Sequence, residues 1–139
     1  VILGEGFERR PDGWDAMQDK LGNRCLQWGY ADSRDEYVRW LWRSDVAPVQ
    51  PKQEYFGLSV VEAMRCEVIP WVPKAHAYPE TTPEHHPYLE DKDWLQALRE
   101  KQWAQWPVSR EAYRIKAFEF DWQQRGERVV KVLESLATH

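Results

Sequence analysis

Short apolar runs alternate with amphipathic stretches along the chain, and this alternation constrains the fold more than any other feature. Four of the apolar runs have the length of β-strands, and apolar residues at helical spacing recur between and after them. Four alternations of strand and helix favour a parallel sheet with helices on both faces and right-handed crossovers. We therefore predict an α/β fold with a Rossmann-like parallel sheet, whose strands cover residues 1–3, 25–28, 46–49 and 68–72.

Local capping signals predict where the helices begin and end. Gly22 ends the first helix, and Ser33-Arg34-Asp35-Glu36 is a capping box in which Ser33 and Glu36 satisfy each other's backbone donors. Ser109 and Asp121 are expected N-caps of later helices. Residues 74–90, rich in proline and histidine, predict a long ordered loop rather than an element. The predicted helices cover residues 11–21, 33–44, 57–66, 91–105, 109–118 and 122–137.

The predicted topology brings four loops to one edge of the sheet. In a parallel sheet every strand-to-helix loop leaves from the carboxyl ends of the strands, and ligands bind there where the strand order reverses. We therefore expect a ligand crevice at this edge. The four loops cover residues 4–6, 29–32, 50–57 and 73–80.

The block from Glu54 to Met64 carries the most chemistry. Gly57 opens a helix and permits close approach of a ligand to the backbone, and the free amides of the first helical turn form a site for a diphosphate. Glu54 and Glu62 are good acceptors for the vicinal hydroxyls of a ribose or hexose. The alternative is purely structural, because Ser59-x-x-Glu62 also fits a capping box, with Arg65 as an ion-pair partner for the acid.

Several separated motifs together resemble the family 4 glycosyltransferases of the GT-B fold. The signature of that family is a Glu-x7-Glu pair around Phe-Gly, followed by Glu-Ala and by a proline in the next strand. The resemblance covers nearly the whole chain and implies the C-terminal half of a GT-B fold, which binds the sugar donor. The matching segments are Trp28-Gly29-Tyr30, Ser44-Asp45-Val46, Glu54-x-Phe56-Gly57-x4-Glu62-Ala63, Ile69-Pro70 and Phe120-Asp121-Trp122.

The resemblance also implies roles for individual residues. Glu54 would contact the transferred sugar, as the candidate catalytic-site residue in a positioning role rather than as a nucleophile, and Glu62 would bind the ribose. The implied reaction retains the anomeric configuration and uses a GDP- or UDP-hexose as substrate, with no cofactor and no metal. Backbone amides would face the diphosphate at Phe56, Gly57, Leu58 and Ser59, and the base would lie beside Gly29 and Tyr30.

The Tyr78-Pro79-Glu80 sequence replaces a glycine-rich loop that many members of this family carry. This version looks like a subgroup that includes the tRNA-queuosine mannosyltransferases, which makes tRNA one candidate acceptor. Lys74 in the same loop is a candidate phosphate ligand, with a solvated surface lysine as the equal alternative.

The chain also departs from the family pattern. The resemblance implies a further strand and helix, with an Arg and a Lys that clamp the diphosphate, upstream of Val1. We expect residues 1–139 to be a donor-binding domain without that unit and without the N-terminal acceptor domain, and to be inactive in isolation. Glu67 stands where the family usually has glycine, and Gln50 and Pro51 replace small hydroxyl residues.

Composition excludes some classes of function. The formal net charge of −4 gives no footprint for wrapping nucleic acid, although it does not exclude a local basic patch. The longest apolar stretch is far too short for a membrane span. Cys25 and Cys66 lack metal-binding spacing and are typical of reduced core residues in a cytoplasmic protein.

Rival hypotheses start from other features. The first is a Rossmann-like interaction module that has lost glycosyl transfer, suggested by Glu67, by the altered loop and by tryptophan-rich helices. The second is a carbohydrate-binding module that uses exposed members of the nine tryptophans, although core packing is their ordinary role. Weaker hypotheses are a nicotinamide site at Gly4-Glu5-Gly6, a metal site at His85-His86 and a hydroxyl-binding His76, with a solvated loop as the alternative for the His pair.

Overall fold

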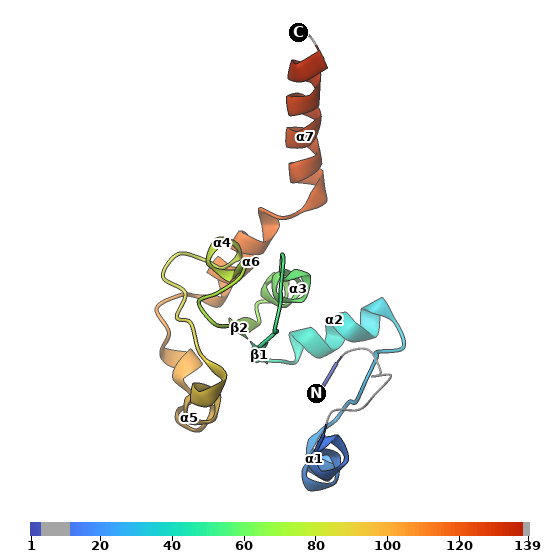
Figure 1. The fold of residues 1–139 in the computed structure, drawn as a ribbon, viewed down its shortest axis with the longest axis vertical. Helices are drawn as coiled ribbons and strands as arrows, with labels where there is room; N and C mark the ends of the chain where they lie inside the picture. The colour runs from blue at the N-terminus through green and yellow to red at the C-terminus, as the bar shows by residue number, and fades with distance from the viewer. Residues whose placement is uncertain (4–11, 138–139) are drawn as a thin grey trace. The chain divides into compact units, whose positions relative to one another are not determined.

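The computed structural model describes residues 1–3 and 12–137. The chain divides into two compact units, Val1–Arg43 and Ser44–His139. Both are a mixture of helices and short parallel pairings (Figure 1). The coarse prediction of a mixed α/β chain is therefore confirmed, whereas the described residues do not form the full four-stranded sheet.

In the first unit, an isolated parallel bridge joins Ile2 to Trp28. The Ile2 amide donates to Gln27 O and the Gly29 amide donates to Ile2 O, both at 3.0 Å. The predicted strands at 1–3 and 25–28 are thus reduced to this bridge. The predicted Gly4-Glu5-Gly6 loop lies outside the described residues, as does the start of the first predicted helix. The helical elements here are α1 (Trp14–Leu21), the 3₁₀ turn η1 (Gly22–Arg24) and α2 (Arg34–Trp42).

The capping box of α2 is confirmed with one change. Ser33 Oγ accepts from the Glu36 amide at 3.1 Å, as predicted. The Glu36 carboxylate, however, accepts from the Asp32 amide at 2.8 Å rather than from Ser33. The same two side chains therefore cap the helix, with the glutamate reaching one residue further back.

The second unit begins with a β-α-β arrangement. Strand β1 (Val46–Pro48) pairs in parallel with β2 (Ile69–Trp71), and α3 (Leu58–Arg65) connects them. Pro48 pairs with Trp71 and Ala47 pairs with Pro70. Proline lacks an amide donor, and both strands of a two-stranded sheet are edges, so the two prolines are tolerated.

Two predictions between residues 74 and 105 were wrong in part. The predicted loop contains a short helix, α4 (Tyr78–Thr81), which begins with proline in its first turn. The predicted helix over 91–105 is broken into η2 (Asp91–Asp93), α5 (Trp94–Glu100) and η3 (Gln102–Gln105). The break falls at Lys101, whose φ of 49° is left-handed and ends α5.

Two further helices follow as predicted, α6 (Arg110–Phe118) and α7 (Trp122–Ala137). Ser109 Oγ accepts from the Ala112 amide at 3.2 Å. Asp121 Oδ1 accepts from the Gln123 amide at 2.9 Å. Both predicted N-caps are therefore confirmed.

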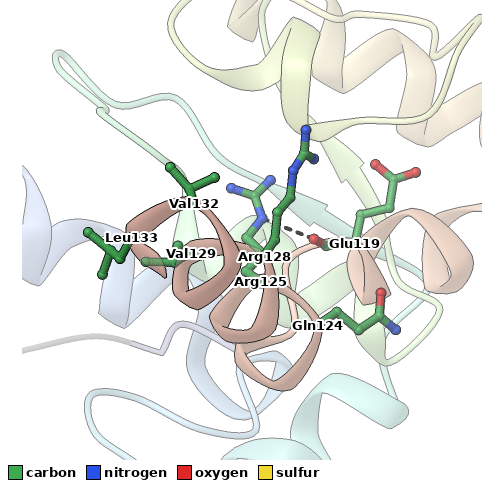
Figure 2. Close-up of a pocket in the computed structure, with 7 residues that line it drawn as sticks. All are labelled: Glu119, Gln124, Arg125, Arg128, Val129, Val132 and Leu133. Atoms are coloured by element: carbon green, nitrogen blue, oxygen red, sulfur yellow. Dashed lines mark hydrogen bonds between the residues drawn. The ribbon is translucent and has the colours of Figure 1, made fainter. Parts of the chain in front are cut away.

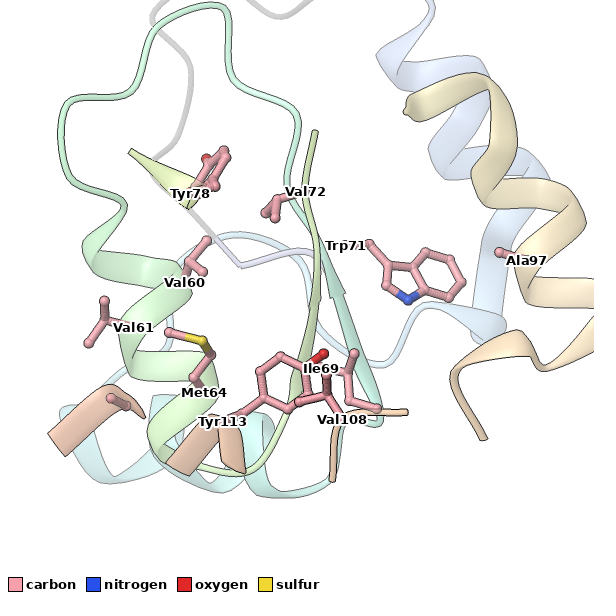
Figure 3. Packing of buried hydrophobic residues seen from close by; sticks show 11 residues of the cluster. Val60, Val61, Met64, Ile69, Trp71, Val72, Tyr78, Ala97, Val108 and Tyr113 are labelled. Atoms are coloured by element: carbon pink, nitrogen blue, oxygen red, sulfur yellow. The ribbon is translucent and has the colours of Figure 1, made fainter. Parts of the chain in front are cut away.

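The core of the second unit lies between α3, β2 and α6 (Figure 3). Trp71 is 1 % exposed, and its ring lies 5.7 Å from that of Trp103. Trp42 and Trp122, in contrast, are 68 % and 76 % exposed, so core packing accounts for only part of the tryptophan content. Cys25 and Cys66 are thiols, each half-buried. The core residues of α3 are Val60, Val61 and Met64, which contact Ile69, Val72, Tyr78, Val108, Tyr113 and Ala117 within one cluster.

Glu67 adopts at the end of α3 a left-handed backbone conformation that favours glycine. Its φ is 62°, its amide donates to Met64 O at 2.9 Å, and the Val68 amide donates to Ala63 O at 3.0 Å. These two bonds form a Schellman motif at the end of α3. Arg114 Nε lies 2.9 Å from Glu67 Oε1, and Arg110 donates to Glu67 O at 3.2 Å. Contacts from α6 therefore compensate for the strained backbone.

Glu67→Gly and Glu67→Ala separate these two contributions. Both variants lose the ion pair with Arg114, which is worth about 0–1 kcal/mol because both side chains are part-exposed. Only glycine also removes the left-handed strain, so we expect Glu67→Gly to exceed Glu67→Ala by about 1 kcal/mol in the free energy of unfolding. Urea denaturation measures the difference, and equal stability of the two variants would contradict the assigned strain.

Candidate functional site

The start of α3 is organised by a glycine and a carboxylate. Gly57 is the N-cap, with a left-handed φ of 80°. Glu54 Oε1 accepts from the Phe56 amide at 3.1 Å and from the Gly57 amide at 2.8 Å. A side chain of the preceding loop therefore binds the amides at the positive end of the helix dipole.

These hydrogen bonds hold Glu54 in its ionised form. The Gly57 amide, followed by the Phe56 amide, lowers the pKa of the carboxyl group below its usual value, against a smaller opposing effect of burial. Donors that bind a carboxylate in this way would also bind another anion. The helix start thus has the electrostatics of an anion site, and the anion that binds there in this structure is the Glu54 carboxylate.

The four amides predicted to face a diphosphate fall into two pairs. Those of Phe56 and Gly57 bind Glu54, whereas those of Leu58 and Ser59 have no acceptor within the described part of the chain. Both Leu58 and Ser59 are exposed. The suggested capping box of Ser59 and Glu62 was wrong, because Gly57 rather than Ser59 occupies the N-cap position.

Tyr78 belongs to this site although the sequence analysis assigned it no role there. Its side chain is fully buried, and its Cε1 lies 3.0 Å from the position that a Cβ on Gly57 would take. Figure 3 shows the ring above Val60, at the N-terminal end of α3. Burial first, and then the negative charge of Glu54, raises the pKa of Tyr78 to about 12. The close approach that Gly57 permits is thus made by a tyrosine of α4.

Other predicted residues lie around this helix start. Glu62 is half-buried in α3, between Val61 and Ala63, which are both buried. The ring of Phe56 is 38 % exposed and packs edge-on against Phe120, with 5.4 Å between the ring centroids. The loop before α3 is therefore anchored to the segment that joins α6 to α7.

Neither Lys74 nor His76 contacts Glu54 directly through a hydrogen bond or ion pair among the described residues. Lys74 is exposed, and its Nζ lies 6.0 Å from the centroid of the Tyr88 ring. His76 is exposed with a left-handed φ of 55°, and its ring lies 6.2 Å from that of Tyr78. The phosphate-binding role of Lys74 remains a prediction.

Gly29 and Tyr30 belong to the first unit, whereas the other predicted site residues belong to the second. Gly29 has a left-handed φ of 81°. Tyr30 is 65 % exposed, and its carbonyl accepts from Gln27 Nε2 at 3.0 Å. Their predicted place beside the base remains a prediction.

The His85-His86 pair divides into one surface residue and one core residue. His85 is exposed, but His86 is 4 % exposed, and its Nδ1 lies 2.9 Å from Tyr113 Oη. Its ring packs edge-on against Tyr88, Trp106 and Tyr113. The expectation of a solvated loop was therefore wrong for His86. The described residues contain no cluster of three or more metal-ligating side chains.

An open groove runs along one face of α7 (Figure 2). Arg125 Nε donates to Glu119 O at 3.0 Å on this face. None of the predicted site residues lines the groove, so it is separate from the start of α3. Its lining residues are Glu119, Gln124, Arg125, Arg128, Val129, Val132 and Leu133.

No protein-family model matches the chain. Over 88 residues, the chain is 31 % identical to the tRNA-queuosine alpha-mannosyltransferase of Drosophila melanogaster. The match covers 63 % of this chain but 23 % of that relative. The chain is thus a distant homologue of part of a glycosyltransferase. Among the described residues, no helix is long and apolar enough to cross a lipid bilayer.

Gly57→Ala tests the constraint at the helix start. Alanine is strained at φ 80°, and its Cβ would collide with the buried Tyr78 ring. We expect a loss of about 2–4 kcal/mol in the free energy of unfolding, measured by denaturant titration. Gly126→Ala in α7 is the matched control, with only ordinary contacts to Trp122, and we expect a gain of about 0.5–1 kcal/mol in helix stability. A neutral Gly57→Ala would contradict the geometry.

His86 makes stability depend on pH. Burial lowers its pKa from 6.5 to about 4, so the unfolded chain binds a proton in a range where the folded chain does not. The free energy of unfolding is therefore at its full value above about pH 6.5. It falls as the pH drops from 6.5 towards 4, by roughly 3 kcal/mol in total. Chemical denaturation across this range should show a shallower pH dependence for His86→Gln than for the wild type. His85→Gln, at the exposed neighbour, should keep the wild-type slope, and identical slopes for all three proteins would contradict the assignment.

Proposed function

We propose that this chain is the donor-binding domain of a retaining hexosyltransferase and that the start of α3 holds the diphosphate of a nucleotide sugar. The observation that carries the proposal is the set of backbone donors at Phe56 and Gly57, which already bind a carboxylate. A diphosphate oxygen is chemically similar to a carboxylate oxygen as an acceptor. The exposed turn of Leu58 and Ser59 supplies two further amides.

In this proposal the two glutamates accept hydrogen bonds from hydroxyl groups on either side of the diphosphate. Glu54 positions the transferred sugar and Glu62 accepts from the ribose. The amides and the helix dipole stabilise the charge that develops on the leaving diphosphate. Glu54 is therefore a positioning residue, because retaining glycosidase-type chemistry needs a second carboxylate close across the scissile bond and the proposal assigns none.

The name of the homologue suggests which sugar is transferred and which acceptor receives it. We infer that the sugar is mannose and that the acceptor is queuosine in tRNA, with transfer carried out by a longer protein that supplies an acceptor-binding domain. The 31 % identity and the Tyr78-Pro79-Glu80 sequence support this inference. The chain's own net charge of −4 leaves most of the tRNA contacts to that other domain.

One rival has a specific observation in its favour. Because Glu54 binds the amides of Phe56 and Gly57 itself, these two donors are satisfied within the chain. An interaction module that no longer transfers sugar would need only this internal pairing. Nucleotide binding separates the two functions, because the rival predicts none.

Glu62→Ala tests the proposed donor site. We expect the chain to bind GDP or UDP in calorimetry or ligand-observed NMR. The variant should bind about tenfold or more weakly, because it lacks the charged carboxylate that accepts hydrogen bonds from the ribose. Glu127→Ala removes an exposed glutamate of α7 and should bind like the wild type. The rival is favoured if the wild-type chain binds neither GDP nor UDP, or if Glu62→Ala binds the nucleotide as tightly as the wild type does.

A further inference from the structure

The hydroxyl of Tyr78 is buried without a hydrogen-bond partner among the described residues. The side chain has no exposed area at all. A buried polar group that bonds to nothing destabilises the folded state, and most such groups in proteins are paired. Such a group therefore calls for a functional explanation, and its surroundings supply one.

Tyr78 packs directly onto the helix start that the proposed function uses. Its Cε1 lies 3.0 Å from the position that a Cβ on Gly57 would take. The charge of Glu54 acts on its hydroxyl, as the raised pKa of Tyr78 records. Within the same few residues, two amides bind Glu54 and the amides of Leu58 and Ser59 have no acceptor in the described chain. The site thus has more donors than acceptors.

A ligand with several anionic oxygens would correct this imbalance. Glu54 offers the amides one carboxylate oxygen, Oε1, which accepts both hydrogen bonds. A diphosphate offers several oxygens on two phosphorus atoms and can accept from the amides and from a phenol together. Its arrival at the Phe56 and Gly57 amides also displaces the carboxylate and leaves Glu54 available for a sugar hydroxyl.

We propose that Tyr78 is a donor-binding residue whose hydroxyl is left unpaired in the free chain and donates to a phosphate oxygen once a nucleoside diphosphate replaces Glu54 at the amides of Phe56 and Gly57. The inference rests on the proposed function and adds a residue to it. Glu54 then has two states, as the acceptor for the Phe56 and Gly57 amides without ligand and as a sugar-positioning group with ligand. Diphosphate binding and placement of the sugar-contacting carboxylate are coupled through this exchange.

Tyr78→Phe tests the inference in the 139-residue chain through two readouts of opposite sign. Removal of an unpaired buried hydroxyl should raise the midpoint of thermal unfolding by about 3–6 °C. The same change should lower the affinity for GDP about tenfold in ligand-observed NMR, because one hydrogen bond to a charged acceptor is lost. Guanosine, which has no diphosphate, should bind the two proteins equally.

Tyr113→Phe is the matched control. Tyr113 is as fully buried as Tyr78, but its hydroxyl is paired with His86 at 2.9 Å. This variant should lower the unfolding midpoint and leave GDP binding unchanged. A purely structural role of Tyr78 would give the same pattern as Tyr113.

The outcomes separate the two proposals. If the wild-type chain binds neither GDP nor UDP, the proposed function fails and the role of Tyr78 fails with it. If the wild type binds GDP and Tyr78→Phe binds it equally well, only the role of Tyr78 is overturned. A Tyr78→Phe variant that is less stable than the wild type also overturns it, because the hydroxyl would then have a partner in the folded chain.

Discussion

The left-handed backbone at Gly57 is the constraint on which the rest of the second unit depends. It ends the loop after β1 and starts α3, and the missing Cβ leaves room for the buried ring of Tyr78. The same turn directs the Phe56 and Gly57 amides to the carboxylate of Glu54. One glycine therefore links the helix cap, the core packing and the candidate site, because all three require a backbone conformation that other residues adopt only with strain.

The candidate site is preorganised around an anion that the chain itself provides. Glu54 is held ionised by backbone donors, and Tyr78 is held neutral by burial and by that negative charge. In the proposed donor site, a phosphate that replaced this carboxylate would meet amides that are already in place.

Contacts distant in the sequence compensate for residues that break local rules. Glu67 occupies a glycine-like turn because Arg110 and Arg114 of α6 bind its carbonyl and its carboxylate. His86 is held in the core by the pairing of its Nδ1 with Tyr113 Oη and by edge-on packing against aromatic rings, although its Nε2 has no partner among the described residues. In both cases α6 supplies the partner, which makes this helix the structural support for the turn after α3 and for the segment after α4.

Local chemistry was sufficient to predict α2, α3, α6, α7 and the two paired strands, because caps and apolar spacing act within a few residues. It also identified Glu54 and Gly57 as neighbours at a helix start. The burial of Tyr78 and His86, the short α4 and the break at Lys101 depended on tertiary packing, which sequence spacing does not encode. Only the folded chain decided that Glu54 binds the Phe56 and Gly57 amides, because the left-handed turn at Gly57 and the packing of Tyr78 against it place those donors beside the carboxylate.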